Sequence, residues 1–193
     1  MARAPRLVAV DGGANRLVDW GLTPEAVIGD MDSVRADIRA VLPAHVLHEM
    51  QEQDTTDFDK ALRSVRAPLV LAVGFQGARL DHGLAVLTAL LVHARQRCIV
   101  VGATDIVFHA PVQIALNLHP GDRLSLFPMA PVTGQSAGLR WPIGGIRFAP
   151  DGMIGTSNQV VSPQVRLEFD APGMLVILPR RRLDAAIAGL TDQ

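Results

Sequence analysis

Two aspartates, Asp30 and Asp32, are separated by one residue in a polar segment that directly follows a short apolar run at 26–28. On a turn, two carboxylates at this spacing can face the same side and offer oxygen ligands to a hard cation such as Mg²⁺. The same segment is also typical of a solvated turn in which Asp32 or Ser33 caps the following helix. For an isolated pair of aspartates the capping interpretation would be favoured, so the metal-binding interpretation depends on the other motifs of the chain.

A second polar segment, at 53–60, directly precedes or opens a predicted helix, whose N-terminus would attract phosphate. Its carboxylates and hydroxyls outnumber the one or two that helix capping requires. Lys60, one turn after Asp57, could neutralise a phosphate oxygen, although an ordinary ion pair within the helix is equally consistent with this spacing. The polar side chains of the segment that we consider are Gln53, Asp54, Thr55, Asp57 and Lys60.

Two glycine-containing loops follow apolar runs and precede predicted helices. Asp11-Gly12-Gly13 either lets a nucleotide approach the backbone closely or only forms a tight turn. The loop at 74–82 carries Arg79 and Asp81, and in such a loop backbone amides and an arginine can hold phosphate. Alone this loop is a weak signal, because Asp81 could equally be a helix cap.

In the second half of the chain, the segments 133–141 and 155–158 combine small polar residues with one tryptophan, Trp141. An exposed indole could stack on a flat cationic ring. By itself, packing of Trp141 in the core is the simpler interpretation, and Ser157-Asn158 also fits a plain turn. These segments therefore gain weight only in combination with the acidic motifs.

The hydrophobic periodicity of the first half alternates between short apolar runs and helical spacing. This alternation predicts a parallel, Rossmann-like α/β sheet, with ligands at the carboxyl ends of its strands. The acidic and glycine-containing loops all fall at such ends. We expect strands at 7–10, 26–28, 68–73, 99–101 and 106–109, and helices at 14–20, 34–42, 56–65 and 80–95.

After about residue 111 the pattern changes to short alternating segments, such as 123–127, 165–169 and 174–178, separated by turn-forming residues. This pattern predicts an antiparallel β-sandwich. We therefore expect an α/β nucleotide-binding domain at 1–112 and a β-sandwich domain at 113–193. The tail from 183 onward should be a short helix or frayed.

Composition narrows the partners and the compartment. Eighteen basic residues nearly balance nineteen acidic ones, which gives no broad field for nucleic acid or an anionic membrane. The single cysteine, Cys98, lies in an apolar run and excludes an intramolecular disulfide. No apolar run approaches the roughly 20 residues of a membrane span. We expect a cytoplasmic protein with no nucleic-acid or membrane partner.

Taken together, the motifs resemble the ordered signature of the thiamine pyrophosphokinase family over nearly the whole chain. They are DGGANRL at 11–17, GDMDS at 29–33, QDTTDFDKAL at 53–62, GARLDH at 77–82, TGQSAGLRWPI at 133–143 and GTSN at 155–158. The resemblance implies an α/β domain, a β-sandwich domain and a homodimer. In that family the active sites lie between the α/β domain of one subunit and the β-sandwich of the other.

The resemblance further implies that the primary hydroxyl of thiamine attacks the β-phosphorus of MgATP, giving thiamine diphosphate and AMP. Asp57 or Asp81 would accept the proton of the hydroxyl. The implied catalytic residues are Asp30, Asp32, Asp57, Asp81 and Lys60, with Asp30, Asp32 and Asp57 as the magnesium ligands. The implied ATP-binding residues are Asp11, Gly12, Gly13, Gln53, Asp54, Thr55 and Arg79. The implied thiamine-binding residues are Trp141, Ser157 and Asn158.

The chain departs from the family pattern at two places. Members usually have another strand and glycine-containing loop before the DGGAN motif, whereas ten residues precede Asp11 here. This predicts either a late recorded start or an incomplete nucleotide site. In the loop before the fourth predicted helix, Phe75 and Ala78 replace glycines, and each added Cβ could narrow the loop.

Two other functions stay open. A phosphohydrolase could use Asp30 as a covalent nucleophile, since an aspartate pair after a strand also suits that chemistry; it would leave the 53–60 segment unused. A non-catalytic thiamine-binding module would explain the short N-terminal segment, and it predicts binding without formation of AMP.

Overall fold

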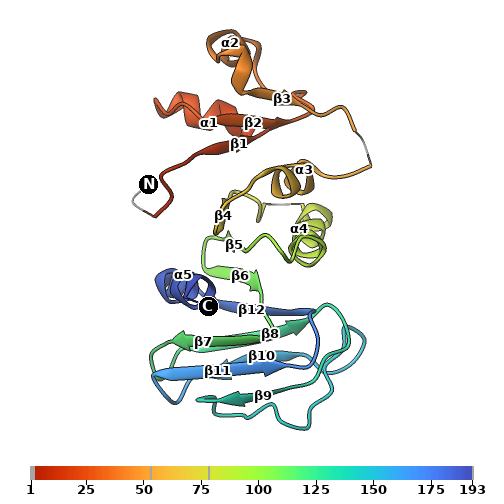
Figure 1. Cartoon of the computed structure of the whole chain (residues 1–193), viewed down its shortest axis with the longest axis vertical. Helices are drawn as coiled ribbons and strands as arrows, with labels where there is room; N and C mark the ends of the chain where they lie inside the picture. The colour runs from red at the N-terminus through yellow and green to blue at the C-terminus, as the bar shows by residue number, and fades with distance from the viewer. Residues whose placement is uncertain (1–2, 53, 78, 193) are drawn as a thin grey trace. The chain divides into compact units, whose positions relative to one another are not determined.

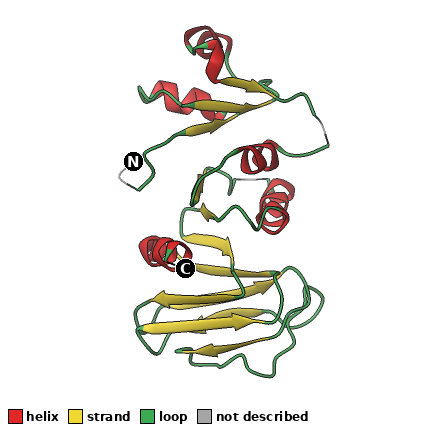
Figure 2. Cartoon of the chain, viewed as in Figure 1, coloured by secondary structure: helices red, strands yellow, loops and turns green. Residues whose placement is uncertain are grey.

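The computed structural model describes residues 3–52, 54–77 and 79–192 and divides the chain into two compact units, Met1–Arg66 and Ala67–Gln193. Figure 1 labels their helices and strands. Figure 2 shows that helices and strands alternate in the first unit, whereas strands predominate in the second. No helix among the described residues is long and apolar enough to span a bilayer.

The first unit is a three-stranded parallel sheet with helices between its strands. Its strands are β1 (Val8–Val10), β2 (Ala26–Gly29) and β3 (Leu47–Glu49), in the order β1-β2-β3. The connecting elements are α1 (Gly13–Asp19), α2 (Ala36–Val41) and the 3₁₀ turn η1 (Ala44–Val46). Because the strands are parallel, their carboxyl ends meet at one edge of the sheet. The predicted strands at 7–10 and 26–28 and the two helices after them are confirmed.

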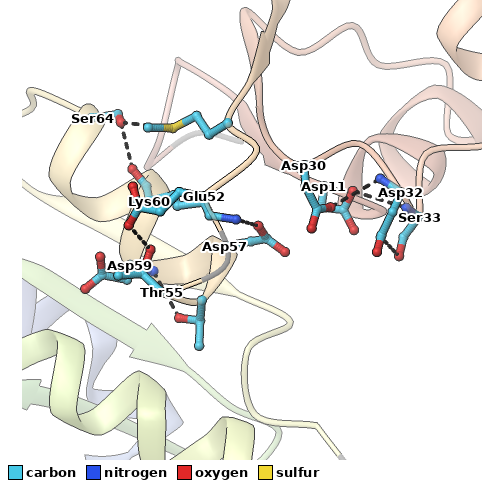
Figure 3. A network of polar contacts seen from close by, with 12 residues as sticks. Asp11, Asp30, Asp32, Ser33, Glu52, Thr55, Asp57, Asp59, Lys60 and Ser64 are labelled. Atoms are coloured by element: carbon cyan, nitrogen blue, oxygen red, sulfur yellow. Dashed lines mark hydrogen bonds and ion pairs between the residues drawn. The ribbon is translucent and has the colours of Figure 1, made fainter.

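Helix α3 (Asp57–Ser64) closes the first unit by packing against β2 and β1. Thr56 caps its N-terminus, since the Thr56 hydroxyl accepts a hydrogen bond of 3.3 Å from the backbone N–H of Asp59. The helix buries Phe58 and Leu62 and, against expectation for a charged residue, Lys60, whose side chain is 2% exposed. The Lys60 ammonium donates to Asp57 Oδ1 at 3.0 Å, as Figure 3 shows.

In the second unit, a six-stranded mixed sheet runs in the order β10-β8-β12-β6-β5-β4. Only β4 (Val70–Val73) and β5 (Cys98–Val101) pair in parallel, with helix α4 (Leu80–Val92) between them in the sequence. The remaining strands pair antiparallel and are β6 (Asp105–His109), β8 (Arg123–Pro128), β10 (Gly155–Gln159) and β12 (Met174–Pro179). The sheet therefore continues across residue 112, where the sequence predicts a domain boundary.

The expectation that strand 106–109 continues the parallel sheet is wrong, because β6 pairs antiparallel with β5 and with β12. Only residues 102–104 connect β5 to β6. A parallel crossover needs a dozen or more residues, whereas a tight turn can join antiparallel neighbours. The short connection thus fixes the direction of β6.

A second, antiparallel sheet faces the first across the main core and has the order β7-β11-β9. It consists of β7 (Gln113–Asn117), β9 (Gly134–Ala137) and β11 (Gln164–Phe169), and alternate residues of β7 and β11 are buried. Ile114, Leu167 and Phe169 belong to one buried cluster with Phe108 and Val176 of the larger sheet. After the 3₁₀ turn η2 (Arg180–Arg182), helix α5 (Leu183–Thr191) packs on β7. The predicted β-sandwich and terminal helix are confirmed.

The Asp57–Lys60 pair should contribute to the stability of the first unit. Asp57→Asn leaves the buried ammonium without its counter-charge, so we expect a loss of about 1–3 kcal/mol in the free energy of unfolding, measured by urea titration. Lys60→Met in the same background should recover most of that loss, because it removes the uncompensated charge. Equal stability of Asp57→Asn and the unchanged protein would show that the pair contributes nothing.

His109 should make the stability of the second unit depend on pH. Its Nε2 accepts a hydrogen bond of 3.1 Å from the backbone N–H of Gly173, and burial lowers its pKa. The unfolded chain then binds the proton more readily, so stability is complete above about pH 6.5 and falls as the pH drops below that value.

The measurement is the melting temperature between pH 8 and pH 5, compared with His109→Gln. We expect the melting temperature of the variant to fall less between pH 8 and pH 5, because glutamine offers an acceptor that does not titrate. An identical decline in both proteins would assign the pH dependence to other groups.

Candidate active site

Three carboxylates meet at the carboxyl edge of the first unit's sheet. Asp11 follows β1, and Asp30 and Asp32 follow β2, the parallel neighbour of β1. One ligand atom from each of the three carboxylates lies within 4.8 Å of the others (Figure 3). Carboxylate oxygens are the ligands that Mg²⁺ and other hard cations prefer. Among the described residues, this is the acidic group whose donor atoms fit a divalent cation.

Unusual backbone conformations bring these carboxylates together. Asp11 has φ +42° and Met31 has φ +66°, both in the left-handed region that non-glycine residues seldom adopt. Met31 is 3% exposed and packs in the first unit's core, which anchors the turn between Asp30 and Asp32. Gly29 has φ +153°, and a Cβ there would lie 2.9 Å from the Asp11 Cβ. A side chain at residue 29 would therefore push the two loops apart.

Hydrogen bonds orient the three carboxylates and use one oxygen of each. Asp30 Oδ1 accepts from the Asp32 backbone N–H at 3.2 Å, and Asp11 Oδ1 accepts from the Ser33 N–H at 3.4 Å. The Ser33 hydroxyl donates to Asp32 Oδ1 at 2.8 Å. Within the described part of the chain, the second oxygen of each carboxylate is thus left for a cation.

The structure groups Asp11, rather than Asp57, with Asp30 and Asp32. The family resemblance placed Asp11 at the nucleotide and Asp57 at the metal. Asp57 lies at the N-terminus of α3 and accepts the Lys60 ammonium, so part of its charge is already balanced. The signal that could have indicated Asp11 is its place at the end of a strand that pairs in parallel with the strand before Asp30.

Glu52, which the sequence reasoning missed, organises the polar segment before α3. The Thr55 hydroxyl donates to Glu52 Oε1 at 2.9 Å, and Arg63 forms an ion pair of 2.5 Å with Oε2. The hydrogen bonds from Arg63 and Thr55 lower the pKa of Glu52. Asp54 is exposed, and Gln53 lies outside the described residues.

In the second unit, Arg79 and Asp81 bind each other at the start of α4. The Arg79 Nη2 to Asp81 Oδ2 distance is 2.6 Å, and both side chains are about two-thirds exposed. The hydrogen bond from Arg79 lowers the pKa of Asp81 to about 2. A carboxylate with so low a pKa is a weak proton acceptor unless the arginine first releases it. Ala78, in the same loop, lies outside the described residues.

Trp141, Ser157 and Asn158 share one pocket of about 310 Å³ in the second unit. Trp141 is 54% exposed, which excludes the interpretation that it packs in the core. Sequence reasoning missed the other lining residues, which belong to no motif in the sequence. The complete lining is Gly121, Asp122, Arg123, Trp141, Ser157, Asn158 and Gln159.

The charged residues of this pocket are already paired within the second unit. Asp122 is buried and accepts from Arg181 and Arg182 as well as from the backbone N–H of His119. Arg123 forms an ion pair with Asp105. The lining side chains of Asp122 and Arg123 thus have partners of opposite charge, and the pocket also offers an indole face and neutral polar groups, which suits a flat heteroaromatic ligand.

Two family models match successive parts of the chain, and the first extends beyond the first unit into the second. Residues 1–101 match the family model described as the thiamin pyrophosphokinase catalytic domain, and residues 111–174 match the thiamin pyrophosphokinase vitamin B1 binding domain. Thiamine pyrophosphokinase 1 of Oryza sativa subsp. japonica is 28% identical in an alignment 203 residues long. The alignment covers 88% of this chain and 77% of the rice protein. Thiamin pyrophosphokinase 1 of Caenorhabditis elegans is 26% identical over 189 residues, with 86% and 76% covered.

Solved structures share the fold. A protein from Lactobacillus plantarum superposes with a TM-score of 0.80 at 25% identity, covering 92% of this chain and 89% of that chain. Thiamin pyrophosphokinase from Geobacillus thermodenitrificans gives a TM-score of 0.76 at 22% identity, with 90% and 85% covered. Because one family model alone spans more than half of the chain and a second one follows it, this chain belongs to the thiamin pyrophosphokinase family.

Proposed function

We propose that this chain transfers the pyrophosphoryl group of ATP to the primary hydroxyl of thiamine, giving thiamine diphosphate and AMP. The observation that carries the proposal is the close group of Asp11, Asp30 and Asp32 in a chain that matches both a catalytic and a vitamin B1 binding family model. Neither alternative function accounts for both matches. A phosphohydrolase needs no vitamin B1 binding domain, and a pure binding module needs no catalytic domain.

Mg²⁺ fits the first unit's carboxylates, which would hold it through the oxygens that do not accept hydrogen bonds from the Asp32 and Ser33 N–H groups or the Ser33 hydroxyl. When bound, the ion would neutralise phosphate charge and align the in-line attack. Asp57 stays a sequence-based candidate for a further ligand. The burial of Lys60 favours a role in holding Asp57 over direct contact with phosphate.

The residues around the phosphates follow from the same geometry. Asp11-Gly12-Gly13 would let the nucleotide approach the backbone at the sheet edge, and the N-terminus of α3, with Asp54 and Thr55 before it, offers backbone amides to phosphate. Arg79 would release Asp81 and bind a phosphate oxygen instead, since both side chains are exposed. The charge-assisted hydrogen bond to phosphate would replace the ion pair with Asp81. This exchange would free Asp81, which together with Asp57 is a candidate to accept the hydroxyl proton.

Thiamine would occupy the pocket of Trp141, Ser157 and Asn158, where the indole can stack on its cationic ring. The reaction needs this pocket and the first unit's carboxylates in one active site. The resemblance to the family implies that two subunits of a homodimer supply them. The homodimer and the cytoplasmic location stay predictions, and light scattering of the purified protein tests the former.

The direct test is an assay of thiamine diphosphate and AMP with thiamine, ATP and Mg²⁺, omitting each component in turn. We expect equal amounts of the two products and none without Mg²⁺. Inorganic phosphate independent of thiamine would support the phosphohydrolase, and thiamine binding without AMP would support the binding module.

Asp30→Asn or Asp32→Asn should lower kcat by about 100-fold or more, because each removes one charge from the metal-binding group. The folded state should be retained, since an asparagine oxygen can still accept the bonds within the turn. Asp19→Asn is the matched control, because Asp19 is exposed and pairs only with Arg35 among the described residues. Turnover of either first variant equal to that of the control would contradict the metal assignment.

Trp141→Ala should raise the KM for thiamine about 3- to 30-fold and leave the KM for ATP nearly unchanged, because a stacked indole contributes about 0.5–2 kcal/mol to cation binding. Initial rates with each substrate varied in turn provide the measurement. Trp20→Ala, at the other tryptophan, which is 69% exposed, is the control. An equal rise in both KM values would indicate a structural tryptophan.

A further inference from the structure

Asn158 makes hydrogen bonds that point away from a role as a ligand-binding side chain. It is 9% exposed, and its Oδ1 accepts from the backbone N–H of Trp141 at 3.2 Å and from that of Gln159 at 2.8 Å. Its Nδ2 donates to the backbone carbonyl of Trp141 at 2.7 Å. One carboxamide therefore holds both backbone polar groups of the tryptophan.

These bonds use most of the hydrogen-bonding capacity of the side chain. A carboxamide oxygen has two lone pairs, and both are directed at backbone N–H groups; the nitrogen has two N–H groups, and one is directed at Trp141. A ligand that took over these bonds would release the Trp141 backbone. Asn158 is thus better placed to hold the Trp141 backbone than to contact a ligand directly.

Trp141 depends on this support because it lies outside the named strands, between β9 and β10. Its neighbour Arg140 is fixed by a backbone bond of 2.8 Å from its N–H to the Gln159 carbonyl. At Trp141 itself, the bonds to Asn158 take the place of a strand ladder. The backbone of Trp141 is therefore held by a side chain instead of a sheet.

The backbone before Asn158 is also specialised. The register of β10 against β8 shifts between Gly155 and Asn158, and Ser157 has φ +61°, in the left-handed region. The Ser157 N–H donates to the hydroxyl of Ser125 at 2.9 Å, and Ser125 is buried. A bulge of this kind redirects the side chains that follow it, here Asn158.

Arg140 covers one face of the indole. Its guanidinium carbon lies 5.1 Å from the centroid of the Trp141 ring, and its Nη1 donates to Gln159 Oε1 at 3.0 Å. With the backbone fixed by Asn158 and one face occupied by Arg140, the other face is the one that a flat ligand can reach.

We propose that Asn158 is a positioning residue that fixes the Trp141 indole for stacking on the flat heteroaromatic acceptor. The identity of that acceptor as thiamine rests on the proposed function, whereas the hydrogen bonds that hold the Trp141 backbone are present in the free protein. Loss of the carboxamide should therefore loosen Trp141 before any ligand is added.

The test uses the full chain with Trp20→Phe, so that Trp141 is the single tryptophan and reports on itself by fluorescence. Asn158→Ala should lower the anisotropy of Trp141 in the free protein and increase its quenching by acrylamide. It should also weaken thiamine binding by a factor similar to that of Trp141→Ala, about 3- to 30-fold. In the Trp141→Ala background, Asn158→Ala should add less than about twofold, measured by calorimetry, because the two changes act on one contact.

Gln96→Ala is the matched control, because Gln96 also holds backbone through three hydrogen bonds, at Ala67 and Arg97, without touching Trp141. It should leave the fluorescence of Trp141 unchanged. If Asn158→Ala does not fold, Asn158→Asp can keep both acceptor bonds but replaces the donor by a charged oxygen that the Trp141 carbonyl repels, and it should also loosen Trp141.

Two results would overturn the proposal and assign Asn158 to direct contact with the ligand. In the first, Asn158→Ala loses thiamine binding while the mobility of Trp141 is unchanged. In the second, the losses of thiamine affinity caused by Asn158→Ala and Trp141→Ala multiply in the double variant. A loosened Trp141 in a protein that never forms thiamine diphosphate would instead sustain the positioning role and refute the proposed function.

Discussion

The first unit depends on the close approach of three like charges. Carboxylates whose ligand atoms lie within 4.8 Å of one another repel each other, so the fold must hold them together against this repulsion. Parallel pairing of β1 and β2 provides a shared edge, and Gly29 lets the loops touch. The left-handed turn at Met31, anchored by burial of that side chain, keeps Asp30 and Asp32 on the same side. Each of these features has a structural cost, which binding of a cation at the proposed site would offset.

In the second unit, the aromatic ring of Trp141 is exposed while neighbouring residues hold its backbone in place. The buried sandwich core includes residues of β8, the neighbour of the edge strand β10, and the irregular part of β10 carries Ser157 and Asn158. Core packing fixes the strand, the carboxamide fixes the tryptophan backbone, and Arg140 occupies one ring face. Preorganisation of this kind reduces the conformational entropy that is lost when a ligand binds.

Much of the fold could be predicted from the sequence, because hydrophobic periodicity and turn residues are local signals. The strands around Val27 and Val100 and the helices at α3 and α4 lie within a few residues of their predicted positions. Strand β3 was missed, since it has only three residues and two of them are exposed and polar. The direction of β6 was also missed, although the short loop before it contained the information.

The sequence indicated which residues are candidates for the site, but not which of them contact one another. Motif order indicated Asp30, Asp32 and Trp141. It could not show that Asp11 joins the carboxylates, that Lys60 is buried, or that Arg79 holds Asp81, because each of these depends on side-chain contacts that tertiary packing decides. Asn158 illustrates the same limit, since its partner Trp141 is 17 positions away in the sequence.

The most direct test of the account is the binding of Mn²⁺, as a paramagnetic substitute for Mg²⁺, followed by electron paramagnetic resonance of the free ion. The grouping of carboxylates predicts that Asp11→Asn weakens Mn²⁺ binding as strongly as Asp30→Asn, whereas Asp57→Asn, checked to be folded, weakens it less. Full binding by Asp11→Asn together with loss of binding in Asp57→Asn would contradict this account and assign the metal to the set implied by sequence motifs alone.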